Sequence, residues 1–275
     1  MKESVIRVEH FTKKFGTTLA VDDISFQIMP GTLVGFVGKN GAGKSTTLRT
    51  FMNMIKPTSG RIQILGMDVV KDARKIKAST CYMPSESIFY ERLKVREVLS
   101  FCLKFSPSSM QEVEELAKRF ELDMDKRIGE LSLGNRKKVS IIQALIKKSK
   151  VILLDEPTSG LDPLMQNLFF ELLLEEKEKG TTIFLSSHNL SEIEKYCDRV
   201  LIIKDGKIAD DLDMSNVKIA HHQMVTYETT DGKKENYEFS GDVNALVKEL
   251  SLMNLRTLEI KNKTVEEEFI DYYKE

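Results

Sequence analysis

The segment at residues 38–46 constrains this chain more than any other, because it has the pattern of a phosphate-binding loop. It reads GKNGAGKST and matches G-x-x-x-x-G-K-[ST]. Glycines let the backbone turn tightly, so that successive amide N–H groups point at an anion, and a following helix adds the positive end of its dipole. An apolar run at residues 33–38 leads into the loop, and a segment with helical apolar spacing follows it. The order of strand, loop and helix is the one that such a loop requires.

The residue types inside the loop predict how a nucleotide would bind. The ammonium of Lys44 is expected between the β- and γ-phosphates, and the hydroxyl of Ser45 is expected on Mg²⁺. The alternative is a glycine-rich turn without a ligand, which the flanking strand and helix disfavour. We therefore predict a nucleotide site made by Gly38, Lys39, Asn40, Gly41, Ala42, Gly43, Lys44, Ser45 and Thr46.

Polar residues end two further apolar runs. The run at residues 151–154 ends in Asp155 and Glu156, and the run at residues 181–187 ends in His188. In open α/β sheets, ligands bind at the carboxyl ends of the strands, so we expect these side chains at the same edge as the loop. The alternatives are a solvated strand end for the two acids and a polar cap for the histidine.

The remaining pattern predicts an α/β fold with a mostly parallel sheet core. Alternating apolar residues between residues 5 and 28 predict a small antiparallel sheet, and residues 86–150 have helical spacing that indicates an inserted helical subdomain. Phe15 lies in the turn of the antiparallel sheet, where its flat ring could stack on an adenine base or simply pack against its neighbours. Asp205 and Gly206 predict the turn of a hairpin.

The character of the sequence changes after about residue 210. We predict a main domain at residues 1–210 and a small α+β accessory domain at residues 211–275, in which no catalytic constellation is visible. The accessory domain is expected to contain a hairpin about Asp231 and Gly232, a helix at residues 244–251, a strand at residues 255–262 and a final helix at residues 265–275.

Composition narrows the classes of partner. The chain has 41 Lys and Arg against 42 Asp and Glu, so it lacks the positive field that holds nucleic acid. Its 3 cysteines are odd in number and widely spaced, which favours a reducing compartment over disulfides or zinc. No stretch approaches the roughly 20 apolar residues of a membrane span, and the N-terminus is too polar for a signal peptide. We expect a cytoplasmic chain that reaches a membrane only through a partner.

Taken as a set, these motifs closely resemble the ATP-binding subunit of an ABC transporter, over about residues 4–210. Besides the phosphate-binding loop, the chain has LSLGN at residues 131–135, VILLDEP at residues 151–157, SGLD at residues 159–162 and a lone histidine after a strand, all in the family's order. The main domain is therefore expected to be a phosphate-loop ATPase of this family.

The resemblance implies a role for each site residue. Asp155 would orient Mg²⁺, Glu156 would orient or deprotonate the attacking water, and His188 would contact the γ-phosphate of ATP. Ser132, Gly134 and Asn135 would form a second anion site for ATP on an opposite subunit, and Asp162 would communicate across that interface. The alternative for LSLGN is an ordinary helix cap. The family pattern thus implies dimerisation, with either an identical or a different second cassette.

Two positions depart from the family pattern. Its usual signature is LSGGQ, whereas Leu133 and Asn135 stand here in place of a glycine and the glutamine. The glutamine expected after the strand at residues 81–84 is replaced by Ser85, which could reach Mg²⁺ only through a bridging water. Next to it, Ile88, Phe89 and Tyr90 lie where the family's membrane subunits dock, or else belong to a local core.

We predict an ATP-hydrolysing subunit on the cytoplasmic face of the cell membrane that dimerises on ATP and drives transport, in the export direction, through separate transmembrane subunits. One alternative is a nucleotide-gated regulatory cassette with weak hydrolysis. Another is an ABC ATPase that works away from membranes, on ribosomes or DNA. The transported substrate cannot be inferred, because selectivity belongs to subunits outside this chain.

Overall fold

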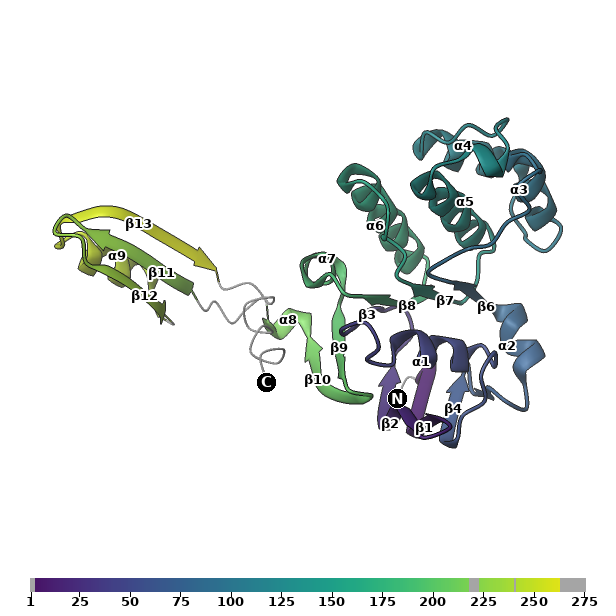
Figure 1. Ribbon diagram of the computed structural model, residues 1–275, viewed down its shortest axis with the longest axis horizontal. Coiled ribbons are helices and arrows are strands. Elements are labelled where there is room, and N and C mark those ends of the chain that lie inside the picture. Colours follow the sequence, from purple (N-terminus) through teal and green to yellow (C-terminus); the bar gives the residue numbers. More distant parts are fainter. Residues whose placement is uncertain (1–2, 218–222, 240, 263–275) are drawn as a thin grey trace.

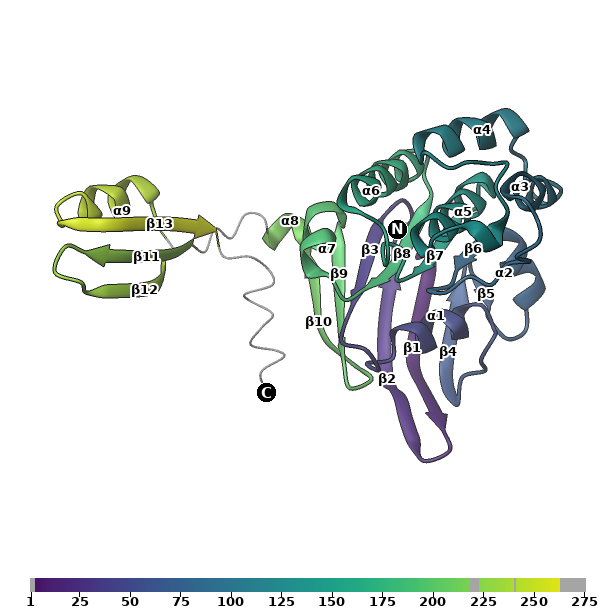
Figure 2. The same ribbon diagram turned by 45° about the horizontal axis from the view of Figure 1, so that its top comes forward.

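The computed structural model describes residues 3–217, 223–239 and 241–262 (Figure 1). The expected final helix at residues 265–275 lies outside the described residues. A body that contains the phosphate-binding loop occupies most of the chain, and a smaller unit of strands and one helix follows it (Figures 1 and 2). In the described part of the chain, no helix is both long enough and apolar enough to cross a membrane.

The body is organised around a sheet in the order β10-β9-β3-β8-β7-β6. Its strands are β3 (Leu33–Val37), β6 (Thr80–Met83), β7 (Val151–Asp155), β8 (Thr182–Ser187), β9 (Arg199–Lys204) and β10 (Lys207–Asp213). All neighbours are parallel except the edge strand β10, which pairs antiparallel with β9 through the expected hairpin. The carboxyl ends of β3, β7 and β8 therefore meet at one edge.

Successive residues of the central strands bury their side chains on opposite faces of this sheet. In β7, Ile152 and Leu154 join one apolar core, whereas Val151 and Leu153 join the other. Because side chains alternate along a strand, a run with apolar residues at every position is stable only when both faces are covered. This is why the short, fully apolar segments of the sequence predicted central strands correctly.

One face is covered by an antiparallel sheet in the order β2-β1-β4-β5. Its strands are β1 (Ile6–Phe15), β2 (Thr18–Ile28), β4 (Ser59–Ile64) and β5 (Met67–Asp68). Four rings fill the space between this sheet, the helix α1 (Lys44–Phe51) and the central sheet: Phe26, Phe36, Phe51 and Phe184. The rings of Phe26 and Phe184 are stacked with centroids 6.0 Å apart. The helix after the phosphate-binding loop is thus held between two sheets.

The other face of the central sheet is covered by helices (Figure 2). The body contains α2 (Ala73–Ser79), α3 (Val95–Leu103), α4 (Met110–Arg119), the short 3-10 helix η1 (Ile128–Glu130), α5 (Leu133–Ile146), α6 (Pro163–Glu178), α7 (Leu190–Tyr196) and α8 (Met214–Val217). Helix α4 begins with a capping box in which Ser109 and Glu112 satisfy each other's backbone N–H groups. Helix α2 and the two-residue strand β5 were not expected from the sequence.

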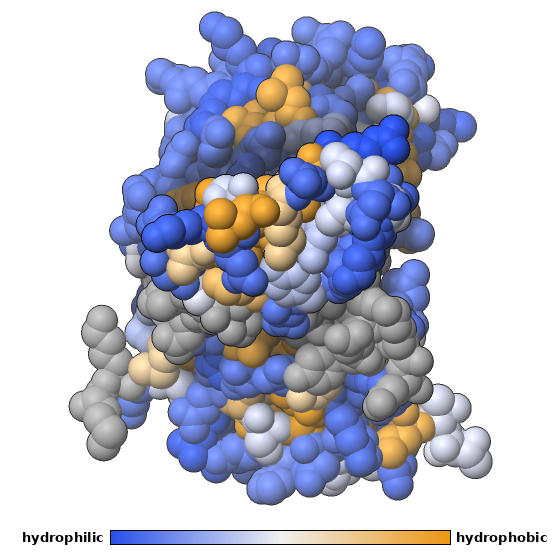
Figure 3. Space-filling view, turned by 90° about the vertical axis from the view of Figure 1, so that its left-hand side faces the viewer, coloured by the Kyte–Doolittle hydropathy of each residue, from blue (hydrophilic) through white to orange (hydrophobic). Residues whose placement is uncertain are grey.

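The smaller unit is a three-stranded antiparallel sheet in the order β12-β11-β13. It contains β11 (Gln223–Thr229), β12 (Lys234–Phe239), α9 (Val243–Leu250) and β13 (Leu255–Asn262). Its core is small and centres on Val225, Leu246 and Leu250. Figure 3 shows apolar side chains interspersed with hydrophilic ones on this end of the molecule.

The expected fold class is confirmed, with a mixed sheet core, an antiparallel β subdomain and helices. The division at residue 210 stays a prediction. Strand β10 continues to Asp213, and the next described strand begins at Gln223. We propose that the small unit is a separate accessory domain.

Gly35 provides a test of how the helices are held on the sheet. A Cβ atom at this position of β3 would lie 2.4 Å from Cγ2 of Ile193 in α7. We expect Gly35→Ala to lower the free energy of unfolding by about 1–3 kcal/mol through overpacking, measured by urea denaturation.

The matched variant is Ile193→Ala, which removes the clashing atoms and by itself costs about 2–4 kcal/mol because Ile193 is buried. The double variant should lose less stability than the two single losses added together. Additive losses would show that the space between β3 and α7 is not what excludes a side chain at residue 35.

Candidate nucleotide-binding site

The phosphate-binding loop joins the buried strand β3 to α1. Gly43 caps α1 with φ 110°, and a Cβ atom there would lie 2.6 Å from the carbonyl oxygen of Ala20, so only glycine fits. The side chain of Lys44 is 5% exposed, and its ammonium donates to the carbonyl oxygens of Gly38 and Lys39. A buried positive charge therefore lies inside the loop, where it can meet a phosphate.

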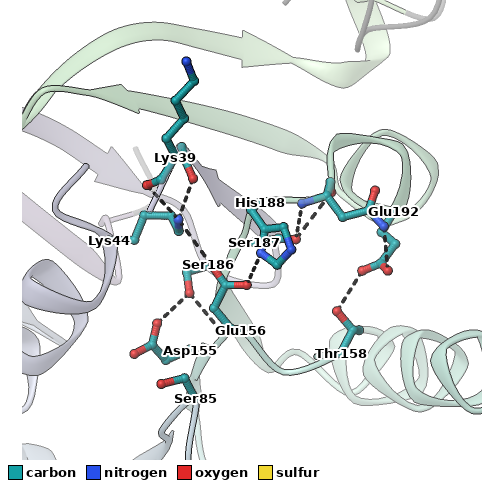
Figure 4. Close-up of polar contacts among 12 residues, drawn as sticks. Lys39, Lys44, Ser85, Asp155, Glu156, Thr158, Ser186, Ser187, His188 and Glu192 are labelled. Carbon is teal, nitrogen blue, oxygen red and sulfur yellow. Dashed lines mark hydrogen bonds and ion pairs between the residues drawn. The ribbon is translucent and has the colours of Figure 1, made fainter. Parts of the chain in front are cut away.

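Asp155 ends β7 beneath this loop and is fully buried. Its Oδ1 accepts a hydrogen bond from Ser45 Oγ at 2.9 Å. It accepts another from Ser186 Oγ at 2.8 Å (Figure 4). The same Ser186 oxygen accepts from the backbone N–H of Glu156 at 3.0 Å. The start of α1 and the ends of β7 and β8 are thus fastened together through one carboxylate and two hydroxyls.

Glu156 bridges the loop and His188. Its Oε1 lies 3.3 Å from Lys44 Nζ, and its Oε2 lies 2.5 Å from His188 Nδ1 (Figure 4). The backbone of Glu156 has φ 49°, a left-handed conformation that is uncommon for a residue with a side chain and costs free energy. Because of this turn, the two adjacent side chains point in different directions. Asp155 is buried at the edge of the sheet, and Glu156 contacts His188.

A cleft of about 260 Å³ opens at this edge. It is lined by Asn40, Gly41, Gly43, Lys44, Ser45, Thr46, Ser85 and Glu156. Six of the predicted loop residues therefore share one cavity with the predicted catalytic acid and with Ser85. Loop residues Gly38 and Lys39 contribute their carbonyl oxygens to Lys44 instead.

The residues beside the cleft fit a hard divalent cation. Oδ2 of Asp155 is buried without a hydrogen-bond partner, and the hydroxyl of Ser45 lies next to the same carboxylate. Mg²⁺ prefers oxygen ligands and is usually held by one or two carboxylates together with phosphate oxygens. An unpaired buried carboxylate oxygen is costly unless a cation completes its environment.

Tyr82 is a further neighbour of this carboxylate. It lies in β6, and burial raises the pKa of its hydroxyl, with the nearby charge of Asp155 adding to the rise. The Tyr82 hydroxyl is therefore held neutral beside the site. Neither Tyr82 nor Ser186 was identified from the sequence. One signal could have indicated Ser186. It is a hydroxyl residue near the end of a buried strand, and that strand pairs with the strand that ends in the two acids.

The signature-like residues and Asp162 do not line this cleft. Ser132 caps α5 by accepting from the N–H of Asn135 at 3.3 Å, and Asp162 caps α6 by accepting from the N–H groups of Leu164 and Met165. A Cβ atom at Gly134 would lie 2.7 Å from the carbonyl oxygen of Gly160, so the two segments touch through their backbones. Helix capping accounts for these contacts within one chain, and a role across an interface stays a prediction.

Phe15 is the last residue of β1 and is half exposed. The ammonium of Lys13 lies 4.7 Å from the centre of its ring, on which a cation–π contact is favourable. Its exposure agrees better with a stacking platform than with a core residue, and the stacking itself stays a prediction.

A second, larger cavity of about 780 Å³ lies between the segment after β6 and helix α3. Its lining is mostly apolar and includes Ile88, Phe89, Tyr90 and Phe101. Ile88 is 99% exposed and Tyr90 is 82% exposed, whereas Phe89 packs against the main core. The sequence left two alternatives for this segment, a docking surface and a local core. Phe89 belongs to the core, whereas Ile88 and Tyr90 face solvent.

Comparisons with known proteins agree on one family. The sequence profile of the family described as ABC transporter matches residues 21–159. The chain is 34% identical over 239 residues to the bacitracin transport ATP-binding protein BcrA of Bacillus licheniformis, covering 84% of this chain and 77% of that protein. It is 35% identical over 218 residues to the Nod factor export ATP-binding protein I of Paraburkholderia xenovorans, covering 76% of this chain and 71% of that protein.

Comparison of the fold with solved structures supports the same family. A solved structure described as the ATP binding subunit of an ABC transporter matches with a TM-score of 0.72 at 28% sequence identity, covering 78% of this chain and 92% of that one.

Ser186 allows a test of the hydrogen bond that joins the end of β8 to Asp155 at the end of β7. We expect Ser186→Ala to lower the free energy of unfolding by about 2 kcal/mol, because Asp155 loses a hydrogen bond while it stays buried. The measurement is urea denaturation. The control is Ser187→Ala in the same strand, whose hydroxyl bonds to the backbone of Asn189 within the described residues; its loss should cost clearly less. Equal losses in the two variants would refute a special role for Ser186.

Proposed function

The chain belongs to the ATP-binding subunits of the ABC transporter family, which are ATPases, and on this premise we propose that it drives export through separate transmembrane subunits by closing and reopening with a second cassette on ATP. The observation that carries the proposal is the Glu156 carboxylate, which lies between the loop lysine and His188 at the nucleotide cleft.

Hydrolysis here requires positioning and charge neutralisation more than covalent chemistry. The loop amides and the ammonium of Lys44 bind the phosphates. A phosphate that attracts Lys44 competes for the ion pair with Glu156, and this frees the Glu156 carboxylate to accept a hydrogen bond from the attacking water. His188 lies within hydrogen-bond distance of Glu156 and fixes its orientation, and from this position it would contact the γ-phosphate. The same side chains thus change partners when ATP enters.

Magnesium completes this site. Asp155 and Ser45 would hold it, directly or through water, and when bound it neutralises the charge of the β- and γ-phosphates. The unpaired Oδ2 of Asp155 supports this assignment. Ser85 lines the same cleft, so its hydroxyl can act through a water molecule.

The second cassette is needed because the signature-like residues lie outside the cleft of their own chain. Ser132 and Gly134 are at the start of α5, where a hydroxyl, backbone amides and the helix dipole favour an anion. We propose that they complete the ATP site of a partner, which can be a second copy or a different cassette. Leu133 between them is 72% exposed and would be covered by that partner.

The apolar cavity beside Ile88 and Tyr90 suits a transmembrane partner. Exposed apolar side chains around a groove are costly in water and mark interaction sites. An inserted helix from a membrane subunit would bury them and place this chain on the cytoplasmic face of the membrane. The export direction is supported by the Nod factor export protein among the relatives, and the transported molecule remains open.

The central test is Glu156→Gln. The amide keeps the shape of the side chain but cannot act as an acceptor of comparable strength for the attacking water, so we expect the steady-state ATPase rate to fall about a hundredfold or more while ATP still binds. The variant should also accumulate an ATP-bound dimer. The measurements are phosphate release and size-exclusion chromatography with and without ATP.

The control is Glu178→Gln, an exposed residue at the end of α6 that should hydrolyse ATP like the unchanged chain. A normal rate in Glu156→Gln would refute the catalytic assignment. An unchanged chain that binds ATP but hydrolyses none at any protein concentration would favour the regulatory cassette instead.

The docking groove has its own test. We expect Ile88→Asp combined with Tyr90→Asp to reduce the fraction of the chain that cosediments with its own membranes by about tenfold, because charges in the groove oppose apolar contact. The ATPase rate of the purified chain should not change. The control is Leu252→Asp, which charges an exposed apolar residue of the small unit that does not line the groove. Equal membrane binding of all variants would contradict docking at this groove.

A further inference from the structure

Lys137 is a buried lysine that the proposed mechanism does not use. It lies in the second turn of α5 and is 6% exposed. Its Nζ donates to the carbonyl oxygen of Ser85 at 2.7 Å, across 52 positions of sequence. Burying an ammonium is costly, so a lysine at such a place needs a compensating environment.

That environment is the nucleotide site. Burial lowers the pKa of Lys137, and the charges of Asp155, Glu156 and Glu86 oppose this shift, in decreasing order. Lys44 Nζ lies 3.3 Å from Glu156 Oε1, and Lys137 Nζ donates to the carbonyl oxygen of Ser85. Both Glu156 and Ser85 line the nucleotide cleft. Two buried cations therefore contact the lining of the cleft, one from the phosphate-binding loop and one from α5.

The hydrogen bond from Lys137 to Ser85 connects the wall of the nucleotide cleft to helix α5. Ser85 follows β6 and lines the nucleotide cleft together with Glu156. Helix α5 begins at the residue after Ser132, which in the proposed function meets the ATP of the second cassette. The turn at Ser85 leads directly into the apolar groove at Ile88. Among the described residues, Ser85 is the hydrogen-bond acceptor found for this ammonium.

We infer that Lys137 is a positioning residue that ties the wall of the nucleotide cleft at Ser85 to the helix that carries Ser132. A rigid helix with a hydrogen bond near its start transmits displacement of that start to the Ser85 carbonyl. The functional roles of the cleft and of Ser132 rest on the proposed function. The hydrogen bond that joins Ser85 to α5 is given by the structure alone.

A lysine at the other end of α5 provides a matched control. Lys147 is the C-cap residue that follows the helix, and it donates to the carbonyl oxygens of Thr80 at 2.6 Å and Lys77 at 2.9 Å. Lys147 therefore bonds to Thr80 at the start of β6, whereas Lys137 bonds to Ser85 just after the end of that strand. Removal of either lysine breaks a link between helix and strand, but only Lys137 is beside the cleft.

The test compares Lys137→Met, Lys137→Gln, Lys137→Arg and Lys147→Met in the full chain. We expect Lys137→Met and Lys137→Gln to lower kcat for ATP by about tenfold or more while KM changes less than about threefold, because binding by the loop is retained. Lys137→Arg, which keeps the charge and the donors, should stay within about threefold of the unchanged chain. Lys147→Met should retain the unchanged kcat.

Amide hydrogen exchange of nucleotide-free protein gives an independent readout. Peptides that span residues 84–90 should exchange at least about threefold faster in Lys137→Met than in Lys147→Met, because the Ser85 carbonyl has lost its anchor. If the methionine variant does not fold, the glutamine and arginine variants are compared in the same way. Unchanged exchange at residues 84–90, or equal effects of the two methionine variants on exchange and kcat, would overturn the inference.

The two hypotheses fail separately in this experiment. If the unchanged chain hydrolyses ATP and the Lys137 variants match it in both assays, the link is wrong and the proposed function stands. If the unchanged chain hydrolyses no ATP, the proposed function fails, and the exchange measurement still decides whether Lys137 anchors Ser85.

Discussion

The buried carboxylate of Asp155 is the interaction on which the rest of the site depends. It is fully buried at the end of β7, and it accepts hydrogen bonds from Ser45 and Ser186. An isolated charge at this depth would be strongly unfavourable, so the loop helix and the neighbouring strand must stay in place around it. The parallel sheet makes this possible, because adjacent strands end at the same edge and bring residues from distant parts of the sequence within hydrogen-bond distance.

The sequence predicted the part of this arrangement that depends on local pattern. Fully apolar runs identified the central strands, since both faces of the sheet are covered, and the loop pattern identified Lys44 and Ser45. The two acids and His188 were expected at one edge because parallel strands end there. Their mutual contacts could not be predicted, since the left-handed backbone at Glu156, which turns its side chain toward the histidine, has no signature in residue type.

The residues that were missed have a common physical reason. Ser186 and Lys137 are ordinary members of a strand and a helix by composition, and their importance follows from what lies across the interface with another element. Ser132 and Asp162 illustrate the opposite case. They were expected as interface residues, yet within one chain both act as helix caps. A capping hydroxyl or carboxylate stands where backbone N–H groups already attract negative charge, so the two roles use the same chemistry and only a second subunit can separate them.

The two buried lysines contact the nucleotide cleft from different elements. Lys44 donates to the loop carbonyls and lies 3.3 Å from Glu156, and Lys137 donates to the carbonyl oxygen of Ser85. In the proposed function, the γ-phosphate would compete with Glu156 for Lys44 and so change the charge balance at the loop. The hydrogen bond from Lys137 would meanwhile hold Ser85, which lines the same cleft, to the helix that Ser132 caps. A displacement of that helix by a second cassette would therefore reach the wall of the cleft through one hydrogen bond.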